Sequence, residues 1–147
     1  MGARVSKVSG ISNVTFAVKD IDEALPFFEQ FLGMPVDERV VIEQDGYDNA
    51  LFYLNGVTIE LLAPLNERSP VARFLARRGP GLYHVGFLVD DFDAGLRERE
   101  EAGLRFASQR EYDESQGRWR EAYTSPRDAF GAILALVERH GTSARQS

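Results

Sequence analysis

The sequence contains no cysteine and no long hydrophobic run, and each absence excludes a class of protein. Without cysteine there is no disulfide scaffold, no thiolate metal site and no cysteine nucleophile. No apolar stretch approaches the roughly 20 residues that a membrane-spanning helix needs. Residues 1–10 carry charges but lack the apolar segment of a signal peptide. We therefore expect a cytoplasmic protein with no membrane partner.

Basic residues are too few for a general nucleic-acid binder. The chain has 17 Lys and Arg against 23 Asp and Glu, a formal net charge of −6, whereas phosphate binding needs a basic surface. Its 147 residues are 44% hydrophobic and 27% charged, the composition of an ordinary soluble globular domain. The sequence thus predicts a single domain with no nucleic-acid partner.

A segment near the N-terminus recurs in the second half of the chain. Residues 13–22 match residues 84–93, and residues 56–62 match residues 131–137. The identities in the first pair are Val14/Val85, Phe16/Phe87, Val18/Val89, Asp20/Asp91 and Asp22/Asp93. Because the matched segments are separated by nearly the same length of chain in both pairs, they predict one module of about seventy residues that is used twice.

Each module is predicted to fold as a strand, a helix and three further strands. Apolar residues alternate over residues 14–18, which is the period of a strand. Asp20 and Asp91 then suit helix N-caps, and Gly33 and Gly103 suit the ends of those helices. The other strands are expected at residues 36–43, 49–54, 58–63, 104–108, 118–124 and 133–138. The predicted fold class is α+β, with two tandem βαβββ modules forming a curved open sheet around a central cavity.

A short helix is predicted between the modules, because Ser69 suits a helix N-cap and Gly79 suits a helix C-terminus. The polar C-terminal residues are expected to form a disordered tail. The predicted organisation is a first module at residues 10–65, a linking helix at 66–80, a second module at 81–138 and the tail at 139–147.

Strand alternation places four equivalent positions on the face that the helices leave uncovered: Asn13, Glu60, His84 and Ala135. A carboxylate on such a face is costly unless it is paired or ligated, and a histidine beside it is a common component of metal and acid–base sites. A hydrogen-bonded core histidine is the alternative for His84. We expect Glu60 and His84 to form an acid–base pair, or to be ligands if a metal is bound.

The paired strand–helix–three-strand modules resemble the vicinal oxygen chelate superfamily, which includes glyoxalase I, extradiol dioxygenases and bleomycin resistance proteins. Within it, residues 60–75 and 81–85 look most like the methylmalonyl-CoA epimerase family, and the resemblance covers residues 10–138. The resemblance implies a divalent metal held by four side chains. In chain order these are a His, a Gln or Glu, a second His and a Glu. The matching positions here are Asn13, Glu60, His84 and Ala135.

Two of these four positions depart from the family pattern. Asn13 offers an amide, which is a poor ligand for transition metals, and Ala135 offers no donor. The resemblance also implies two catalytic bases, which fall at Ala135 and Asn49, and neither side chain can abstract a proton. We therefore expect a degenerate metal site, with no cofactor or a weakly bound divalent metal, and not a standard methylmalonyl-CoA epimerase.

Glu121 is the counterpart of Asn49 in the repeat and can supply a missing carboxylate. The catalytic candidates are therefore Glu60, His84 and Glu121. Alternatively, Glu121 pairs with Arg118 or Arg120 at the rim of the cavity. Amide and aromatic side chains that could contact a flat ligand are the substrate-binding candidates: Asn13, Asn49, Tyr47, Tyr83, Trp119 and Tyr123. Ordinary packing is the alternative for each aromatic residue.

Two functions from different classes fit these residues. The first is an isomerase, epimerase or cyclase that moves protons next to the carbonyl of a small metabolite or acyl thioester. Its enzyme class would be isomerase or lyase. The second is a metal-free binding protein that sequesters an aromatic or drug-like ligand. We favour the enzyme. We also expect a homodimer, because unpaired strand edges and a surplus of aromatic residues favour association.

Overall fold

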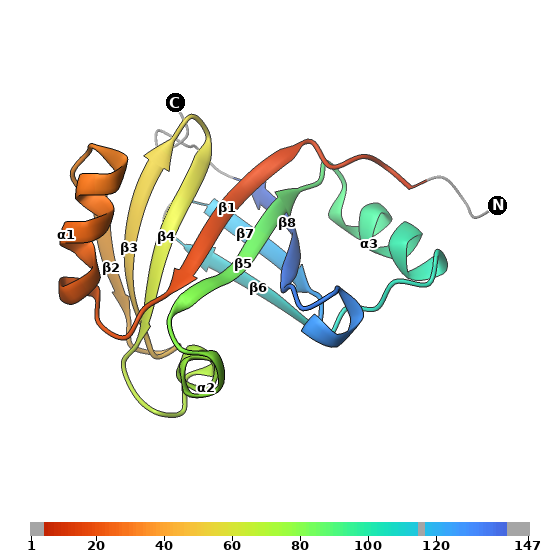
Figure 1. Ribbon diagram of the computed structural model, residues 1–147. Coiled ribbons are helices and arrows are strands. Elements are labelled where there is room, and N and C mark those ends of the chain that lie inside the picture. The colour runs from red at the N-terminus through yellow and green to blue at the C-terminus, as the bar shows by residue number, and fades with distance from the viewer. Residues whose placement is uncertain (1–4, 115–116, 141–147) are drawn as a thin grey trace. The chain divides into compact units, whose positions relative to one another are not determined.

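The computed structural model describes residues 5–114 and 117–140 and divides into two compact units. The first unit is Val14–Tyr83, and the second unit joins the described residues before Val14 to those from His84 onward. Strand β1 (Gly10–Ala17) crosses the boundary between the two sets of residues (Figure 1). No helix in the described ranges is long and apolar enough to cross a membrane.

The first unit contains the first βαβββ module and a helix that follows it. After β1 come α1 (Ile21–Leu32), β2 (Glu38–Ile42), β3 (Tyr47–Leu54), β4 (Val57–Pro64) and α2 (Pro70–Arg78). The strands lie in the order β2-β3-β4-β1. Asp20 begins α1 by accepting a hydrogen bond from the backbone amide of Glu23, and Gly33 ends α1 in the left-handed conformation.

Helix α1 covers one face of this sheet, as Figure 1 shows beside β2 and β3. Ile21 packs there against Ala50, Phe52 and Leu61, all of which are almost fully buried. Alternate residues of β3 and β4 therefore point to the opposite face of the sheet. Near one end of that second face, α2 packs through Val71 against Tyr47 and other residues.

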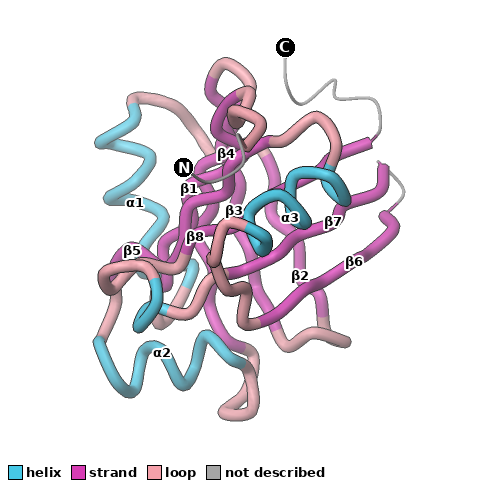
Figure 2. The backbone as a smooth tube through the Cα atoms, turned by 90° about the vertical axis from the view of Figure 1, so that its right-hand side faces the viewer, coloured by secondary structure: helices cyan, strands magenta, loops and turns pink. Residues whose placement is uncertain are grey.

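The second unit contains the second module. Its elements are β5 (Gly81–Leu88), α3 (Phe92–Glu101), β6 (Ser108–Glu114), β7 (Gly117–Tyr123), a short 3-10 helix (Pro126–Asp128) and β8 (Leu134–His140). The strands lie in the order β5-β8-β7-β6, and β5 is parallel to β8. Helix α3 crosses β7 and β8 in Figure 2 and packs Phe92 and Leu96 against Ala122 and Leu136.

Equivalent residues of the two modules make equivalent contacts. The amide of Val18 donates to the carbonyl of Leu62, and the amide of Val89 donates to the carbonyl of Val137, both at 3.0 Å. The repeat in the sequence aligns the two donors with each other and the two acceptors with each other. Asn49 lies opposite Leu62 on β3 and β4 just as Glu121 lies opposite Val137 on β7 and β8. The predicted α+β fold of two tandem βαβββ modules is confirmed.

One strand lies elsewhere than the sequence predicted. Strand β6 is Ser108–Glu114, whereas a strand was expected at residues 104–108. The residues that prompted that prediction lie before the strand. The backbone amide of Leu104 bonds to the carbonyl of Arg99 at the end of α3, and the side chain of Phe106 packs against the α3 core. Strand β8 extends through His140, into the segment expected to be a tail, and residues 141–147 lie outside the described residues.

Candidate active site

The first unit presents three polar side chains on the face opposite α1: Thr15, Asn49 and Glu60. Thr15 is fully buried and Asn49 is 7% exposed. The Thr15 hydroxyl donates to Oε1 of Glu60 at 2.8 Å, and Nδ2 of Asn49 donates to Oε2 at 3.2 Å. The Glu60 carboxylate is thus held in one orientation.

Asn49 has a second polar atom on this face. Its Oδ1 is buried and has no hydrogen-bond partner among the residues that the structure describes. A buried acceptor without a partner is costly. A donor group of a ligand would satisfy it, which fits the prediction that Asn49 contacts substrate.

In the second unit, the face opposite α3 carries His84. The side chain is 8% exposed, and its ring meets the ring of Tyr123 edge to face, with centroids 5.2 Å apart. His84 and Gly86 are two residues apart on β5, so they face the same side. Gly86 lies opposite Ala135 in the parallel pair of β5 and β8. A Cβ atom on Gly86 would overlap the amide of Asn13, so the Asn13 side chain lies on this face too.

The surroundings of His84 favour a neutral imidazole. Burial is the larger cause and the positive charge of Arg110 is the smaller one, and together they lower the pKa of His84 from 6.5 to about 4. Near neutral pH the ring therefore carries one N–H donor and one acceptor nitrogen. A neutral imidazole can donate a hydrogen bond to a carbonyl oxygen but carries no charge to stabilise a nearby carboxylate.

Glu121 shares this face with His84. It is 5% exposed and lies on β7 two residues before Tyr123. In the antiparallel pair of β6 and β7 it lies directly opposite Arg110, so the two side chains are on the same side of the sheet. The cation that acts on His84 is therefore also adjacent to the buried carboxylate of Glu121.

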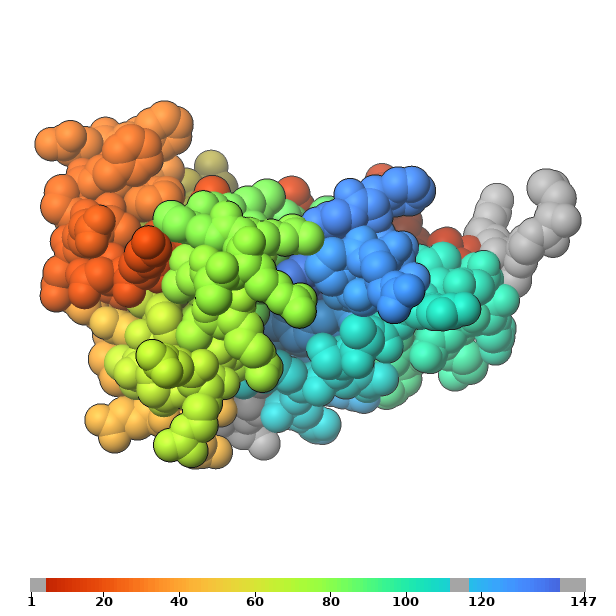
Figure 3. Space-filling model, turned by 60° about the horizontal axis from the view of Figure 1, so that its bottom comes forward, coloured from red at the N-terminus to blue at the C-terminus, as the bar shows by residue number. Residues whose placement is uncertain are grey.

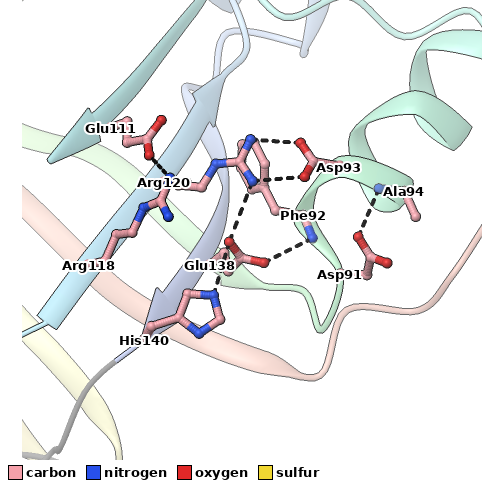
Figure 4. Close-up of polar contacts among 9 residues, drawn as sticks. All are labelled: Asp91, Phe92, Asp93, Ala94, Glu111, Arg118, Arg120, Glu138 and His140. Carbon is pink, nitrogen blue, oxygen red and sulfur yellow. Dashed lines mark hydrogen bonds and ion pairs between the residues drawn. The ribbon is translucent and has the colours of Figure 1, made fainter. Parts of the chain in front are cut away.

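Two neighbouring arginines of β7 bond to carboxylates other than Glu121, as Figure 4 shows. Arg120 donates to both carboxylate oxygens of Asp93, at 2.7 and 3.0 Å, and lies 3.7 Å from Oε2 of Glu138. Arg118 bonds to Glu111. Since successive side chains of a strand alternate in direction, Arg118 and Arg120 point away from the face of Glu121. The two arginines considered as rim partners of Glu121 thus bond to other carboxylates in the structure.

The aromatic candidates have different surroundings. Tyr123 contacts His84, and Trp119 lies under the guanidinium of Arg139, 5.4 Å from the ring centroid. Tyr47 is buried in the cluster that packs against α2, and Tyr83 meets Phe74 of α2 at 4.9 Å. Tyr47 and Tyr83 therefore contribute to core packing and Tyr123 contacts His84, and a role in binding substrate remains a prediction for all four aromatic residues.

The donor chemistry does not fit the four-ligand metal set that the resemblance implies. On the second unit, the implied positions hold an amide, an imidazole and a methyl group, in Asn13, His84 and Ala135, and a methyl group cannot ligate. Within residues 5–114 and 117–140, no cluster of three or more His, Cys, Asp or Glu side chains could hold a metal ion. Glu60 belongs to the first unit, so its predicted pairing with His84 remains a prediction.

Comparison with known proteins decides the family. Residues 13–123 match the model of the Glyoxalase/Bleomycin resistance protein/Dioxygenase superfamily. The chain belongs to this superfamily. The mitochondrial methylmalonyl-CoA epimerase of Homo sapiens is 28% identical over 129 residues, which cover 87% of this chain and 73% of the relative.

Two solved structures extend the comparison. The crystal structure of methylmalonyl-CoA epimerase from Mycobacterium tuberculosis is 31% identical with a TM-score of 0.77, covering 94% of this chain and 93% of that one. A Streptomyces coelicolor methylmalonyl-CoA epimerase in complex with 2-nitronate-propionyl-CoA is 28% identical with a TM-score of 0.77, covering 89% and 97%. The similarity to the epimerase family expected from the sequence is therefore confirmed.

Sequence reasoning missed two residues of these clusters. Thr15 bonds to Glu60, and its position two residues after Asn13 on β1 was the available signal. Arg110 acts on His84 and lies opposite Glu121. It was missed because β6 was expected before residue 108, and only the pairing of β6 with β7 reveals its direction.

Proposed function

We propose that this protein catalyses proton transfer at the carbon next to the carbonyl of an acyl thioester, as an isomerase or epimerase. The observation that carries the proposal is the buried Glu121 carboxylate on the sheet face that also holds the neutral His84. The epimerase relatives, one of them bound to an acyl-CoA analogue, support the thioester substrate.

Each residue has a separate role in this proposal. Glu121 removes the proton from the α-carbon, and the electrons of the C–H bond form an enolate. A ring N–H of His84 donates a hydrogen bond to the carbonyl oxygen, where negative charge develops. Glu60, oriented by Thr15 and Asn49 and carrying a proton at this stage, gives that proton to the opposite side of the carbon and becomes a carboxylate. In the reverse direction the two carboxylates exchange roles.

This division of labour differs from that of a standard methylmalonyl-CoA epimerase. The bases that the resemblance implies fall at Asn49 and Ala135, neither of which can accept a proton. A substrate with a different group on the α-carbon would be deprotonated by Glu121 instead. We therefore propose an acyl thioester other than methylmalonyl-CoA as the natural substrate.

Exchange of the α-proton in heavy water tests the proposal without knowledge of the natural substrate. The purified protein is incubated with 2-substituted acyl thioesters, including methylmalonyl-CoA, and deuterium incorporation is followed by mass spectrometry. We expect exchange in the wild type and a loss of roughly 10²–10⁴-fold in Glu121→Gln and in Glu60→Gln. Glu111→Gln is the matched control, because Glu111 lies on the other face of the sheet and bonds to Arg118.

The stereochemistry of exchange separates the two carboxylates. If Glu60 and Glu121 act from opposite sides of the α-carbon, neither Gln variant should interconvert the two stereoisomers of the substrate. Each variant should still exchange the α-proton of one stereoisomer slowly, and the two variants should prefer opposite stereoisomers. Full exchange in both Gln variants with every thioester would contradict the proposal.

The methyl group of Ala135 favours a second candidate, a metal-free binding protein for an aromatic or drug-like ligand. In that case Glu121→Gln would leave ligand affinity unchanged, and the wild type would exchange no α-protons. We further propose that the protein is a cytoplasmic homodimer that holds a weakly bound divalent metal or none.

A further inference from the structure

In each module two successive residues with positive φ precede the last strand, in a two-residue hairpin in the first module and at the end of the longer β7–β8 loop in the second. In the first module Asn55 and Gly56 have φ angles of 47° and 83°, and in the second module Phe130 and Gly131 have φ angles of 56° and 88°. The alignment of the two modules that pairs β4 with β8 also pairs these two turns. Phe130 thus occupies the position that Asn55 occupies in the other module.

Phenylalanine suits neither the conformation nor the exposure of this position. A positive φ at both residues favours Asn-Gly, and a bulky side chain there is strained. Burial does not compensate, because the Phe130 side chain is fully exposed. A strained backbone conformation that burial does not offset is a feature of functional sites, which points to a role for Phe130 in binding.

Hydrogen bonds on both sides of Phe130 hold the backbone of its loop in one conformation. The amide of Ala129 donates to the carbonyl of Pro126 at 3.2 Å, and the amide of Gly131 donates to the same carbonyl at 2.8 Å. The Thr124 hydroxyl closes the base of the loop by donating to the carbonyl of Ala132 and accepting from the amide of Leu134.

This loop borders the His84 cluster. It leaves β7 directly after Tyr123, whose ring meets His84, and the carbonyl of Ile133 at its far end accepts from the amide of Val85 at 3.3 Å. In Figure 3 the loop lies in the blue segment at the surface that faces the viewer. A ligand that reaches the His84 face with one end can therefore contact the loop with another part.

We propose that Phe130 stacks on the adenine ring of a coenzyme A thioester, with exposed Arg127 near its phosphates. The inference rests on the proposed function, because a thioester of coenzyme A carries its reacting acyl group at one end and its nucleotide at the other. Arg127 is a solvent-exposed cation in a protein with a net charge of −6, and exposed Asp128 follows it. Adenine is the part of such a ligand that an exposed aromatic ring can stack on.

Binding of coenzyme A itself, measured by calorimetry, tests this contact separately from turnover. Phe130→Asn introduces the residue found in the first module, so the turn is expected to keep its shape and the protein to unfold at the same or a higher temperature. We expect its affinity for coenzyme A to fall about ten-fold, the range of a lost base–aromatic stack. Phe130→Trp keeps the stacking surface and should keep the affinity.

Pantetheine, which lacks the nucleotide, is the matched ligand and should bind the wild type and Phe130→Asn equally well. Equal affinity of the wild type and Phe130→Asn for coenzyme A overturns the inference, as does the absence of coenzyme A binding to the wild type. A lower molecular mass of Phe130→Asn in light scattering also overturns it, because the ring would then contact a second copy of the chain. Exchange with a pantetheine thioester reports on the proposed function independently of any of these results.

Discussion

His84 shows how far a residue's neighbours decide its chemistry. The sequence identified the position through the repeat, and strand alternation predicted the face of the sheet on which it lies. Its protonation state depends on burial and on Arg110, which lies far along the chain on a strand whose location was predicted wrongly. No local pattern connects the two residues. The position of the histidine was thus predictable, and its neutral state was not.

The lowered pKa of His84 makes stability depend on pH. The unfolded chain binds a proton near pH 6.5, whereas the folded protein resists protonation until about pH 4, so the unfolded state gains protons first as the pH falls. The stabilisation is complete above pH 6.5 and is lost as the pH falls toward 4. We expect His84→Gln to remove this dependence, which amounts to about 3 kcal/mol of unfolding free energy.

Urea unfolding between pH 7 and pH 4 measures this difference. The wild type should lose more unfolding free energy than His84→Gln over that range. The variant His140→Gln, which removes the other histidine, is the control and should behave as the wild type does. Parallel pH curves for the wild type and His84→Gln would show that the imidazole is not buried as described.

At the scale of elements, the success of sequence reasoning follows local signals. Asp20 and Asp91 begin α1 and α3 as predicted, because an N-cap bonds to an amide three residues away. Strand β6 lacks such a signal. Its residues are nearly all polar, and its pairing with β7 decides where it begins. Polar edge strands resist association with other sheets, so the absence of an apolar pattern has a physical reason.

Helix α3 contains a glycine whose replacement sets two effects against each other. Alanine in a helix interior is favoured over glycine by about 1 kcal/mol. A Cβ atom on Gly95, however, would lie 2.8 Å from Cγ2 of Val89, inside the buried cluster beneath α3. The overlap should exceed the gain in helix propensity, so we expect Gly95→Ala to lower the free energy of unfolding by about 1 kcal/mol or more.

A double-mutant cycle in urea separates the two effects. In a Val89→Ala background the contact is gone, so Gly95→Ala should no longer destabilise the protein and should stabilise it slightly. If Gly95→Ala is equally destabilising in both backgrounds, the contact with Val89 is not the cause.

At the scale of the whole molecule, duplication explains most of what the sequence predicted. The residues that the repeat aligns reappear as paired hydrogen bonds and as matched strand registers. Internal comparison also shows where the copies have diverged, as with Phe130 in place of Asn55 and Glu121 in place of Asn49. What the repeat cannot predict is association, since it compares one chain with itself.

The homodimer is a prediction about the assembled protein. Light scattering at micromolar concentration should give a mass near twice the 16.5 kDa of one chain. A mass equal to that of one chain across the micromolar range would contradict it.

Asn13 and Ala135 stand at two of the metal-ligand positions that the resemblance to the superfamily implies, and we expect substitutions there to create a tight metal site. Asn13 already lies beside Gly86, and Ala135 lies opposite Gly86 on β8, both on the face of His84. In Asn13→His with Ala135→Glu, two imidazoles and a carboxylate share that face, a donor set suited to zinc or cobalt. Elemental analysis after dialysis should find far less than one equivalent of metal in the wild type and about one in the double variant.

Asn13→His with Ala129→Glu is the control variant. It adds the same groups but puts the carboxylate in the β7–β8 loop, and it should bind no more metal than the wild type. A full equivalent of zinc, cobalt or manganese held by the wild-type protein would show that Asn13 and Ala135 do not limit metal binding.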